Sequence, residues 1–259
     1  MRQVLDRGWR VAATGLCFST FGLGGLALRL VAFPLLRAAV WQERRRCELA
    51  RDMIRLGLRA FVRLMCLVGV MTLEIRGAER LRRRGLLVLA NHPTLIDVVI
   101  LMSLVRNADC VVKMALRRNP FTRGPVISAG FLCNDEGPGL VDAAIASLEA
   151  GSNLIIFPEG TRTVPGEPLR LQRGAANISA RGGRRVTPVL IHCDRPWLTK
   201  GTPWWRVPLR RAHVIVEVQD DFSPEPFLHE AGPAIAARRI TGHLADHFTK
   251  ELARVDAAA

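Results

Sequence analysis

A histidine and an aspartate stand five positions apart, directly after an apolar stretch of strand length. The stretch is Leu86–Ala90, and Asn91, His92 and Pro93 follow it. Proline is favoured at the first position of a helix, so we expect a helix to begin at Pro93. Asp97 would lie about one turn further on and reach back to His92. A carboxylate on one ring nitrogen leaves the other free to accept a proton, so this pair predicts a general base.

A second polar turn follows the apolar stretch Leu154–Phe157. Gly160 allows a tight turn, Arg162 can hold an anion through two N–H groups, and Glu159 can orient that arginine or accept from a substrate hydroxyl. Each turn alone also fits a structural role, as a helix cap or a salt-bridged loop. Two such turns at the ends of two apolar strands favour a site, with a base beside a pocket for an acidic acceptor.

The elements that must position these turns alternate between strand-length and helical stretches. Apolar runs of strand length are Leu86–Ala90, Cys110–Lys113, Gly130–Cys133, Leu154–Phe157, Val186–Ile191 and Ala212–Val218. Helical patterns are Gly139–Ala150, Arg173–Arg181 and Pro233–Val255. The alternation predicts an α/β fold, a mostly parallel sheet covered by helices. We expect a catalytic domain over residues 74–259, preceded by a membrane-associated helical segment over residues 1–73.

The N-terminal segment carries an uncharged run, Val11–Leu28, close to the ~20 residues that span a bilayer. Arginines on both sides fit a helix in the cytoplasmic leaflet, and spanning and re-entrant forms both stay open. Its glycines 22, 24 and 25 predict helix packing. A second helix is expected over Met53–Leu73, as an ordinary surface helix or as an interfacial helix. In the interfacial form, one stripe of cations would meet lipid phosphates: Arg51, Arg55, Arg59 and Arg63.

The composition narrows the partners and cofactors. The formal net charge is +14, with 37 basic against 23 acidic residues, nearly all of the basic ones arginine. An anionic partner is therefore expected, either membrane lipids or an acidic carrier protein. Nucleic acid is not expected, because no zinc spacing or RNA-binding pattern is present. The six cysteines show no C-x-x-C spacing and fit a reducing compartment, and His243 and His247 have no third ligand nearby, so no metal is expected.

The motifs Asn-His-Pro-Thr-Leu-Ile-Asp at 91–97 and Phe-Pro-Glu-Gly-Thr-Arg at 157–162 together resemble the lysophospholipid acyltransferase family. This family includes the glycerol-3-phosphate and 1-acylglycerol-3-phosphate acyltransferases. The resemblance covers roughly residues 75–195. It continues in Lys113 with Gly130-Phe131, and in Val186–Val189.

The resemblance implies that His92 is the base, that Asp97 orients it, and that no covalent intermediate or cofactor is needed. An acyl group would pass from acyl-CoA or acyl carrier protein to the free hydroxyl of a lysophospholipid such as 1-acylglycerol-3-phosphate. The implied location is the cytoplasmic face of the cell membrane. The residues expected to bind substrate or shape its pocket are Asn91, Lys113, Glu159, Gly160, Thr161, Arg162 and Pro188.

Two departures from the family's pattern support an alternative acceptor. Asn134, Asp135 and Glu136 stand where the family commonly has an arginine that helps to bind the acceptor phosphate, and Ala115 replaces a frequent glutamate. The alternative is transfer from acyl carrier protein to a phosphate-free hydroxyl or amine in a specialised lipid or pigment pathway. A non-enzymatic protein that binds lipid surfaces is a second alternative. The tryptophan-rich stretch at 197–205 would either anchor a loop at the membrane interface or pack over the site.

Overall fold

The computed structural model describes residues 2–134, 139–164, 166–230 and 232–258. Asp135 and Glu136 therefore lie outside the described residues. A seven-stranded sheet runs through the described chain in the order β1-β7-β6-β2-β5-β3-β4. The strands are β1 (Met71–Arg76), β2 (Leu87–Ala90), β3 (Ala108–Val112), β4 (Leu132–Cys133), β5 (Asn153–Ile156), β6 (Val186–Cys193) and β7 (Ala212–Val218).

Neighbouring strands run parallel except for β6 and β7, which are antiparallel. The predicted α/β fold with a mostly parallel sheet is therefore confirmed. Strand β1 was not predicted, because its short apolar stretch follows a helix without a break in hydropathy. It pairs with β7, far along the chain, with Met71 opposite Ala212.

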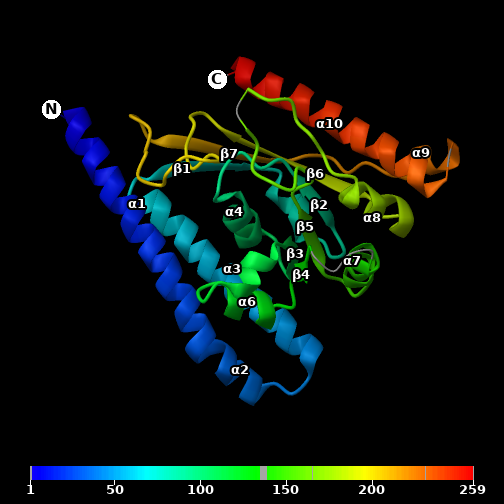
Figure 1. Ribbon diagram of the computed structural model, residues 1–259, viewed down its shortest axis with the longest axis horizontal. Helices are drawn as coiled ribbons and strands as arrows, with labels where there is room; N and C mark the ends of the chain where they lie inside the picture. Colours follow the sequence, from blue (N-terminus) through cyan, green and yellow to red (C-terminus); the bar gives the residue numbers. More distant parts are fainter. Residues whose placement is uncertain (1, 135–138, 165, 231, 259) are drawn as a thin grey trace.

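Helices cover both faces of the sheet (Figure 1). One face carries α1 (Arg2–Ala27), α3 (Glu43–Leu67), α4 (Asp97–Leu104) and α6 (Arg123–Ser128), with α5 (Met114–Arg118) beside them. The other carries α7 (Gly139–Glu149), α8 (Gly174–Gly182) and α10 (Pro233–Ala258), with α9 (Glu225–Glu230) before α10. Strand β2 lies between the two layers, and all four of its residues are buried. The site that follows β2 is therefore built on the most enclosed part of the sheet.

The N-terminal helices form one long element. Helix α1 continues through a π-helical stretch, Leu28–Ala32, into α2 (Phe33–Ala39). Residues 6–39 are long and apolar enough to cross a membrane, by length and composition alone. These helices share one buried apolar cluster with α3, α4 and the sheet. The division of the chain at residue 73 stays a prediction.

Two of the three glycines expected to pack against a helix, Gly22 and Gly25, pack instead against the loop between α5 and α6. A Cβ on Gly25 would lie 2.6 Å from the carbonyl oxygen of Phe121, and one on Gly22 would lie 3.7 Å from the Phe121 ring. Glycine therefore allows this loop to approach the helix backbone. Gly24 meets nothing within 4 Å and lies on the wall of a cavity described below.

Helix α3 begins and ends earlier than predicted. One of its arginines, Arg51, does not face lipid as expected. The helix stops before Gly69, whose φ of +79° is left-handed. Arg51 is buried and forms an ion pair with Asp109 on β3, with 3.1 Å between Nη2 and Oδ2. Its Nε and Nη1 also donate to Ala129 O and Ser152 Oγ, both at 2.8 Å. The expected stripe of lipid-facing arginines is therefore wrong for Arg51.

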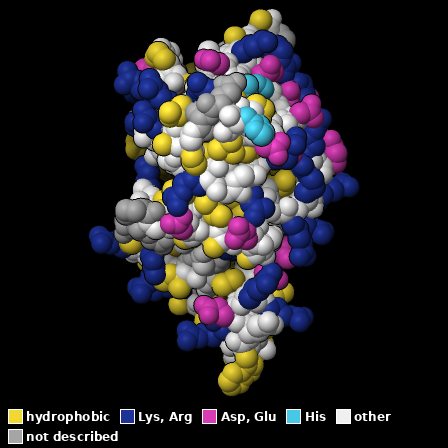
Figure 2. Space-filling view, turned by 90° about the vertical axis from the view of Figure 1, so that its right-hand side faces the viewer, with side chains coloured by type: hydrophobic (Ala, Val, Ile, Leu, Met, Phe, Trp, Pro, Cys, Tyr) yellow, Lys and Arg dark blue, Asp and Glu magenta, His cyan; other side chains and the backbone are white. Residues whose placement is uncertain are grey.

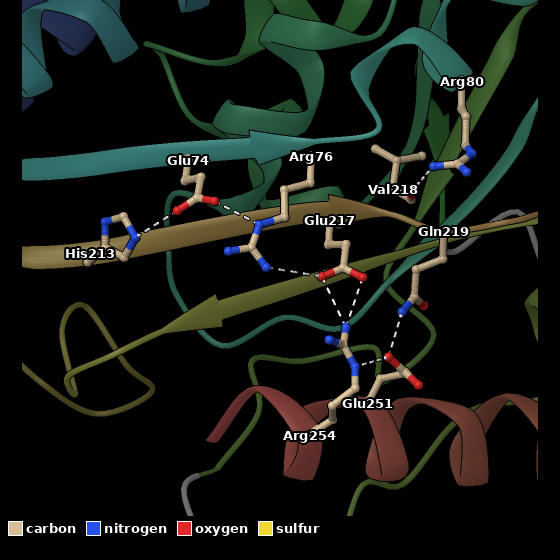
Figure 3. A network of polar contacts seen from close by, with 9 residues as sticks. All are labelled: Glu74, Arg76, Arg80, His213, Glu217, Val218, Gln219, Glu251 and Arg254. Carbon is tan, nitrogen blue, oxygen red and sulfur yellow. Dashed lines mark hydrogen bonds and ion pairs between the residues drawn. The ribbon is translucent and has the colours of Figure 1, made fainter. Parts of the chain in front are cut away.

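An exposed network of hydrogen bonds and ion pairs connects strands β1 and β7, at one edge of the sheet, to α10 (Figure 3). Glu217 of β7 accepts from Arg254 of α10 at 2.9 Å and lies 3.7 Å from Arg76 of β1. Arg254 also donates to Glu251, which accepts from Gln219. Exposed pairs of this kind contribute little each, so the apolar side of α10 provides most of its attachment. Figure 2 shows basic and acidic side chains interspersed over one face, without a single basic patch.

Candidate active site

The predicted contact between His92 and Asp97 is present, but the helix between them is not. Residues 94–96 form a bend and a turn, and α4 begins at Asp97. Asp97 Oδ2 accepts from Thr94 N at 2.7 Å and from His92 Nδ1 at 2.8 Å. Thr94 Oγ1 donates to the other carboxylate oxygen. These bonds close the turn locally, so the chain after Pro93 does not need to be helical to bring the two side chains together.

The carboxylate of Asp97 is shut off from solvent, with an exposed fraction of 0%. Burial raises the pKa of the Asp97 carboxyl, and the hydrogen bonds from His92 and Thr94 act in the opposite direction. The His92 side chain is 15% exposed, and its Nε2 has no hydrogen-bond partner within the described chain. One ring nitrogen is therefore held by a carboxylate while the other is available to a substrate.

The second polar turn closes directly onto the first. Glu159 Oε1 accepts from His92 N and from Thr163 Oγ1, both at 2.8 Å, and Thr163 N donates to His92 O at 2.7 Å. The Phe157 ring lies against the imidazole, with 4.3 Å between centroids. Glu159 is 8% exposed, and burial raises its pKa. Glu159 therefore positions the backbone of His92, a task the sequence did not reveal.

The expected pairing of Glu159 with Arg162 is absent from the described structure. Arg162 Nη1 instead donates to Leu198 O at 2.9 Å and to Thr199 O at 3.0 Å. The carbonyl of Leu198 also accepts from Leu95 N at 3.1 Å, and Leu198 has a left-handed φ of +52°. The segment after β6 thus forms a wall of the site. No motif indicated this wall, because its contacts are made by backbone carbonyls.

Asn91 and Pro188 hold strands in place. The side chain of Asn91 donates to Ile191 O and accepts from Ile191 N, both at 2.7 Å, and is 1% exposed. Asn91 therefore joins β2 to β6, and its expected role in binding substrate stays a prediction. Pro188 is buried within β6, opposite Leu89 of β2.

The remaining predicted residues lie at the same edge of the sheet as His92, where the parallel strands reach their carboxyl ends. Lys113 directly follows β3 and is exposed, and Asn134 directly follows β4 and is also exposed. Gly160 has a φ of +67°, so the tight turn predicted there is present. Thr161 is half-buried next to it. Lys113 is thus a cation available to an anionic substrate, whereas Asn134 supplies none.

An apolar cavity of about 650 Å³ lies between α1, α3 and α4 on the same side of the sheet. Val98 and Val99, which directly follow Asp97, form part of its wall, as does Val112, which precedes Lys113. The rest of the wall is almost entirely apolar and includes Phe21, Leu28, Ile54, Met102, Val126 and Phe131. The cavity therefore adjoins the turn that carries His92 and Asp97, and it suits a long hydrocarbon chain.

No cluster of three potential metal ligands occurs among the residues that the structure describes. His247 Nε2 instead pairs with Gln219 Oε1 at 2.6 Å, on the opposite layer from the site. The fold and site thus define an α/β protein with a carboxylate-supported imidazole at a strand end, beside a lipid-sized cavity.

Comparison with known proteins shows a similarity to acyltransferases. A model of the acyltransferase family matches residues 72–192 of this chain. A lyso-ornithine lipid O-acyltransferase of Pseudomonas aeruginosa is 34% identical over 134 residues, 50% of this chain and 51% of that protein. A 1-acyl-sn-glycerol-3-phosphate acyltransferase of the same organism is 25% identical over 141 residues, 52% and 54% of the two chains. The chain spans about half the length of the curated relatives it matches.

A solved structure extends the likeness to the whole fold. The crystal structure of the 1-acyl-sn-glycerophosphate (LPA) acyltransferase PlsC from Thermotoga maritima superposes with a TM-score of 0.72 at 20% identity. The match covers 96% of this chain and 98% of that one, so the N-terminal helices are part of the shared architecture.

Proposed function

We propose that the chain transfers a fatty acyl group from an acyl thioester to the free hydroxyl of a lysophospholipid-type acceptor. The observation that carries this proposal is the pairing of His92 with the fully buried Asp97, which leaves Nε2 unbonded within the described chain. The match to the acyltransferase family model and the adjoining apolar cavity support it. Acyl-CoA or acyl carrier protein would supply the thioester.

In the proposed reaction, His92 first accepts a proton and then donates it. His92 Nε2 accepts the proton of the acceptor hydroxyl as its oxygen attacks the thioester carbonyl, and Asp97 stabilises the imidazolium that forms. The carbon–sulfur bond then breaks as the new carbon–oxygen bond is completed. The proton passes from His92 to the departing thiolate, so the products are an ester and a free thiol. Glu159 fixes the backbone of His92 throughout.

The acyl chain would occupy the cavity beside α4, where Val98 and Val99 bring its wall next to the base. This placement aligns the thioester carbonyl with Nε2 and removes the chain from water. The long apolar element at residues 6–39 would hold the protein at the cytoplasmic face of the cell membrane, where both lipid substrates are available.

A phosphate-free acceptor is the second candidate, and two observations favour it. Arg162 Nη1 is engaged by two backbone carbonyls, and Asn134 stands where an additional cation would assist phosphate binding. The relative with the higher identity is named for lyso-ornithine lipid, which makes that acceptor class the natural comparison.

The test offers both acceptors to the purified chain in lipid micelles. Acyl-CoA and acyl carrier protein donors are supplied with 1-acylglycerol-3-phosphate or lyso-ornithine lipid, and products are identified by mass spectrometry. We expect one acceptor to gain an acyl group as free thiol is released. Thiol release without an acylated phosphate-bearing product would reject the lysophospholipid acceptor in favour of the second candidate.

A further inference from the structure

The segment between β6 and β7 exposes a pair of tryptophans. Trp204 is 40% and Trp205 is 54% exposed, and their rings meet edge to face with 5.7 Å between centroids. Leu209, four residues after Trp205, is 65% exposed. Tryptophan has a large apolar body and a polar N–H, a combination that is favoured at the boundary between lipid and water.

The exposure of these rings is not a sign of a loose loop. Before them, Trp197 and Leu198 are buried at 1% and 2% exposure, and after them Val207 is buried at 5%. The carbonyls of Pro208 and Leu209 accept from the buried guanidinium of Arg10 on α1, at 3.1 and 2.6 Å. The segment is therefore fixed at both ends while its aromatic centre projects outward.

The charge of this segment is entirely positive. Residues 195–211 contain no aspartate or glutamate, and their cations are Arg195, Lys200, Arg206, Arg210 and Arg211. The last four of these are exposed. Aromatic rings among arginines and lysines match the anionic headgroups of a cytoplasmic leaflet, where each cation close to the surface adds to binding.

The tryptophan pair is continuous with the N-terminal helix. A Cβ on Gly15 would lie 3.3 Å from the Trp204 ring, and the rings of Trp204 and Phe18 are 6.1 Å apart. Figure 1 shows the β6–β7 connection beside the N-terminal part of α1. Along α1 and the π-helical stretch that continues it, exposed apolar side chains recur every seven residues and form a stripe: Trp9, Leu16, Leu23 and Leu30. The aromatic pair therefore extends the surface of the one described helix that is long and apolar enough to cross a membrane.

We propose that residues 200–211 form a second membrane contact, which places Trp204 and Trp205 at the headgroup level of an anionic bilayer. The proposal rests on the proposed membrane association of α1. The contact also bears on the reaction, because the two residues directly before this segment, Leu198 and Thr199, supply the carbonyls that hold Arg162. The wall of the active site and the lipid contact are thus one continuous piece of chain.

The test uses the full chain in vesicles of phosphatidylcholine and phosphatidylglycerol. Lipids brominated close to the headgroup quench tryptophans that reach them, and the quenched fraction is compared for wild type, Trp204→Phe/Trp205→Phe and Trp197→Phe. We expect the double variant to lose a large part of the quenching and the buried-site control to keep it. Equal quenching in wild type and the double variant would overturn the proposal.

A second measurement separates this contact from the proposed reaction. Trp205→Ala, which removes the more exposed ring and leaves Trp204 packed on α1, should reduce acyl transfer in vesicles but leave transfer in detergent micelles unchanged. Loss of transfer in micelles would show a role in the site itself and would overturn the membrane assignment. A change from oligomer to monomer, with vesicle activity unaltered, would identify a contact between copies and would also overturn it.

Discussion

Replacement of Asp97 by asparagine separates the charge of the buried carboxylate from its shape. The asparagine oxygen can accept from His92 Nδ1 and Thr94 N as the aspartate does, while its amide donates to the Thr94 hydroxyl, which can rotate to accept. The folded structure thus keeps its contacts. What it loses is the negative charge that stabilises the imidazolium of His92.

The expected rate loss follows from that charge. General base catalysis contributes about 10²–10⁴ in rate, which is ~2.7–5.4 kcal/mol of barrier. Burial raises the pKa of Asp97, so removing its charge has little cost for folding. We expect stability to change by no more than ~1 kcal/mol, or about 2–4 °C in Tm. The variant should therefore be folded and nearly inactive.

Thr94→Val is the matched control, in which we expect a larger loss of stability and a smaller loss of rate than in Asp97→Asn. It removes the hydroxyl that donates to Asp97 but leaves the carboxylate and its contact with His92. We expect it to lose ~1.5–3 kcal/mol of stability, the value of a hydrogen bond to a charged group, with a smaller loss of rate than Asp97→Asn. Single-turnover thiol release and thermal unfolding in detergent measure both. Retention of more than about a tenth of the wild-type rate in a folded Asp97→Asn protein would refute the reasoning.

Three further predictions concern packing, burial and pH. Gly25→Ala should lose ~1–3 kcal/mol in thermal unfolding, because its Cβ would lie 2.6 Å from a carbonyl oxygen, whereas Gly24→Ala has open space and should lose none. Arg51→Ala should lose ~3–5 kcal/mol by leaving Asp109 buried without its ion-pair partner, and no measurable loss in unfolding would contradict the buried pair. Burial raises the pKa of Glu159, so the folded protein binds this proton more tightly than the unfolded chain, and the ionised group costs stability at high pH. The Tm of Glu159→Gln relative to wild type should therefore be highest near pH 8 and fall towards pH 5, and a difference that rises as pH falls would reverse this assignment.

Much of the sheet could be predicted because its strands are short, apolar and separated by glycine-ended helices. The meeting of His92 with Asp97 was also predictable, because the two residues are only five positions apart. The helix expected at Pro93 was wrong, because bonds from Thr94 to Asp97 replaced the helical hydrogen bonds there. Strand β1 was not predicted, because the strand that it pairs with, β7, is distant in sequence.

The surroundings of the site were less predictable, because they depend on contacts between distant segments. Arg51 was expected to face lipid from its spacing on a helix, but the partner that buries it, Asp109, lies on a separate strand. Arg162 was expected to pair with a carboxylate, but backbone carbonyls after β6 occupy it. Carbonyl positions depend on the fold of the connecting segment and leave no signature in residue type.

The central claim is that His92 removes a proton from a lipid hydroxyl during acyl transfer. The most direct measurement compares wild type, His92→Ala and His229→Ala, an exposed histidine on α9, for formation of a two-chain lipid from a thioester donor and a single-chain acceptor. We predict that wild type and His229→Ala form the acylated product, and that folded His92→Ala forms about 10²–10⁴ less. Undiminished product from His92→Ala would contradict the account.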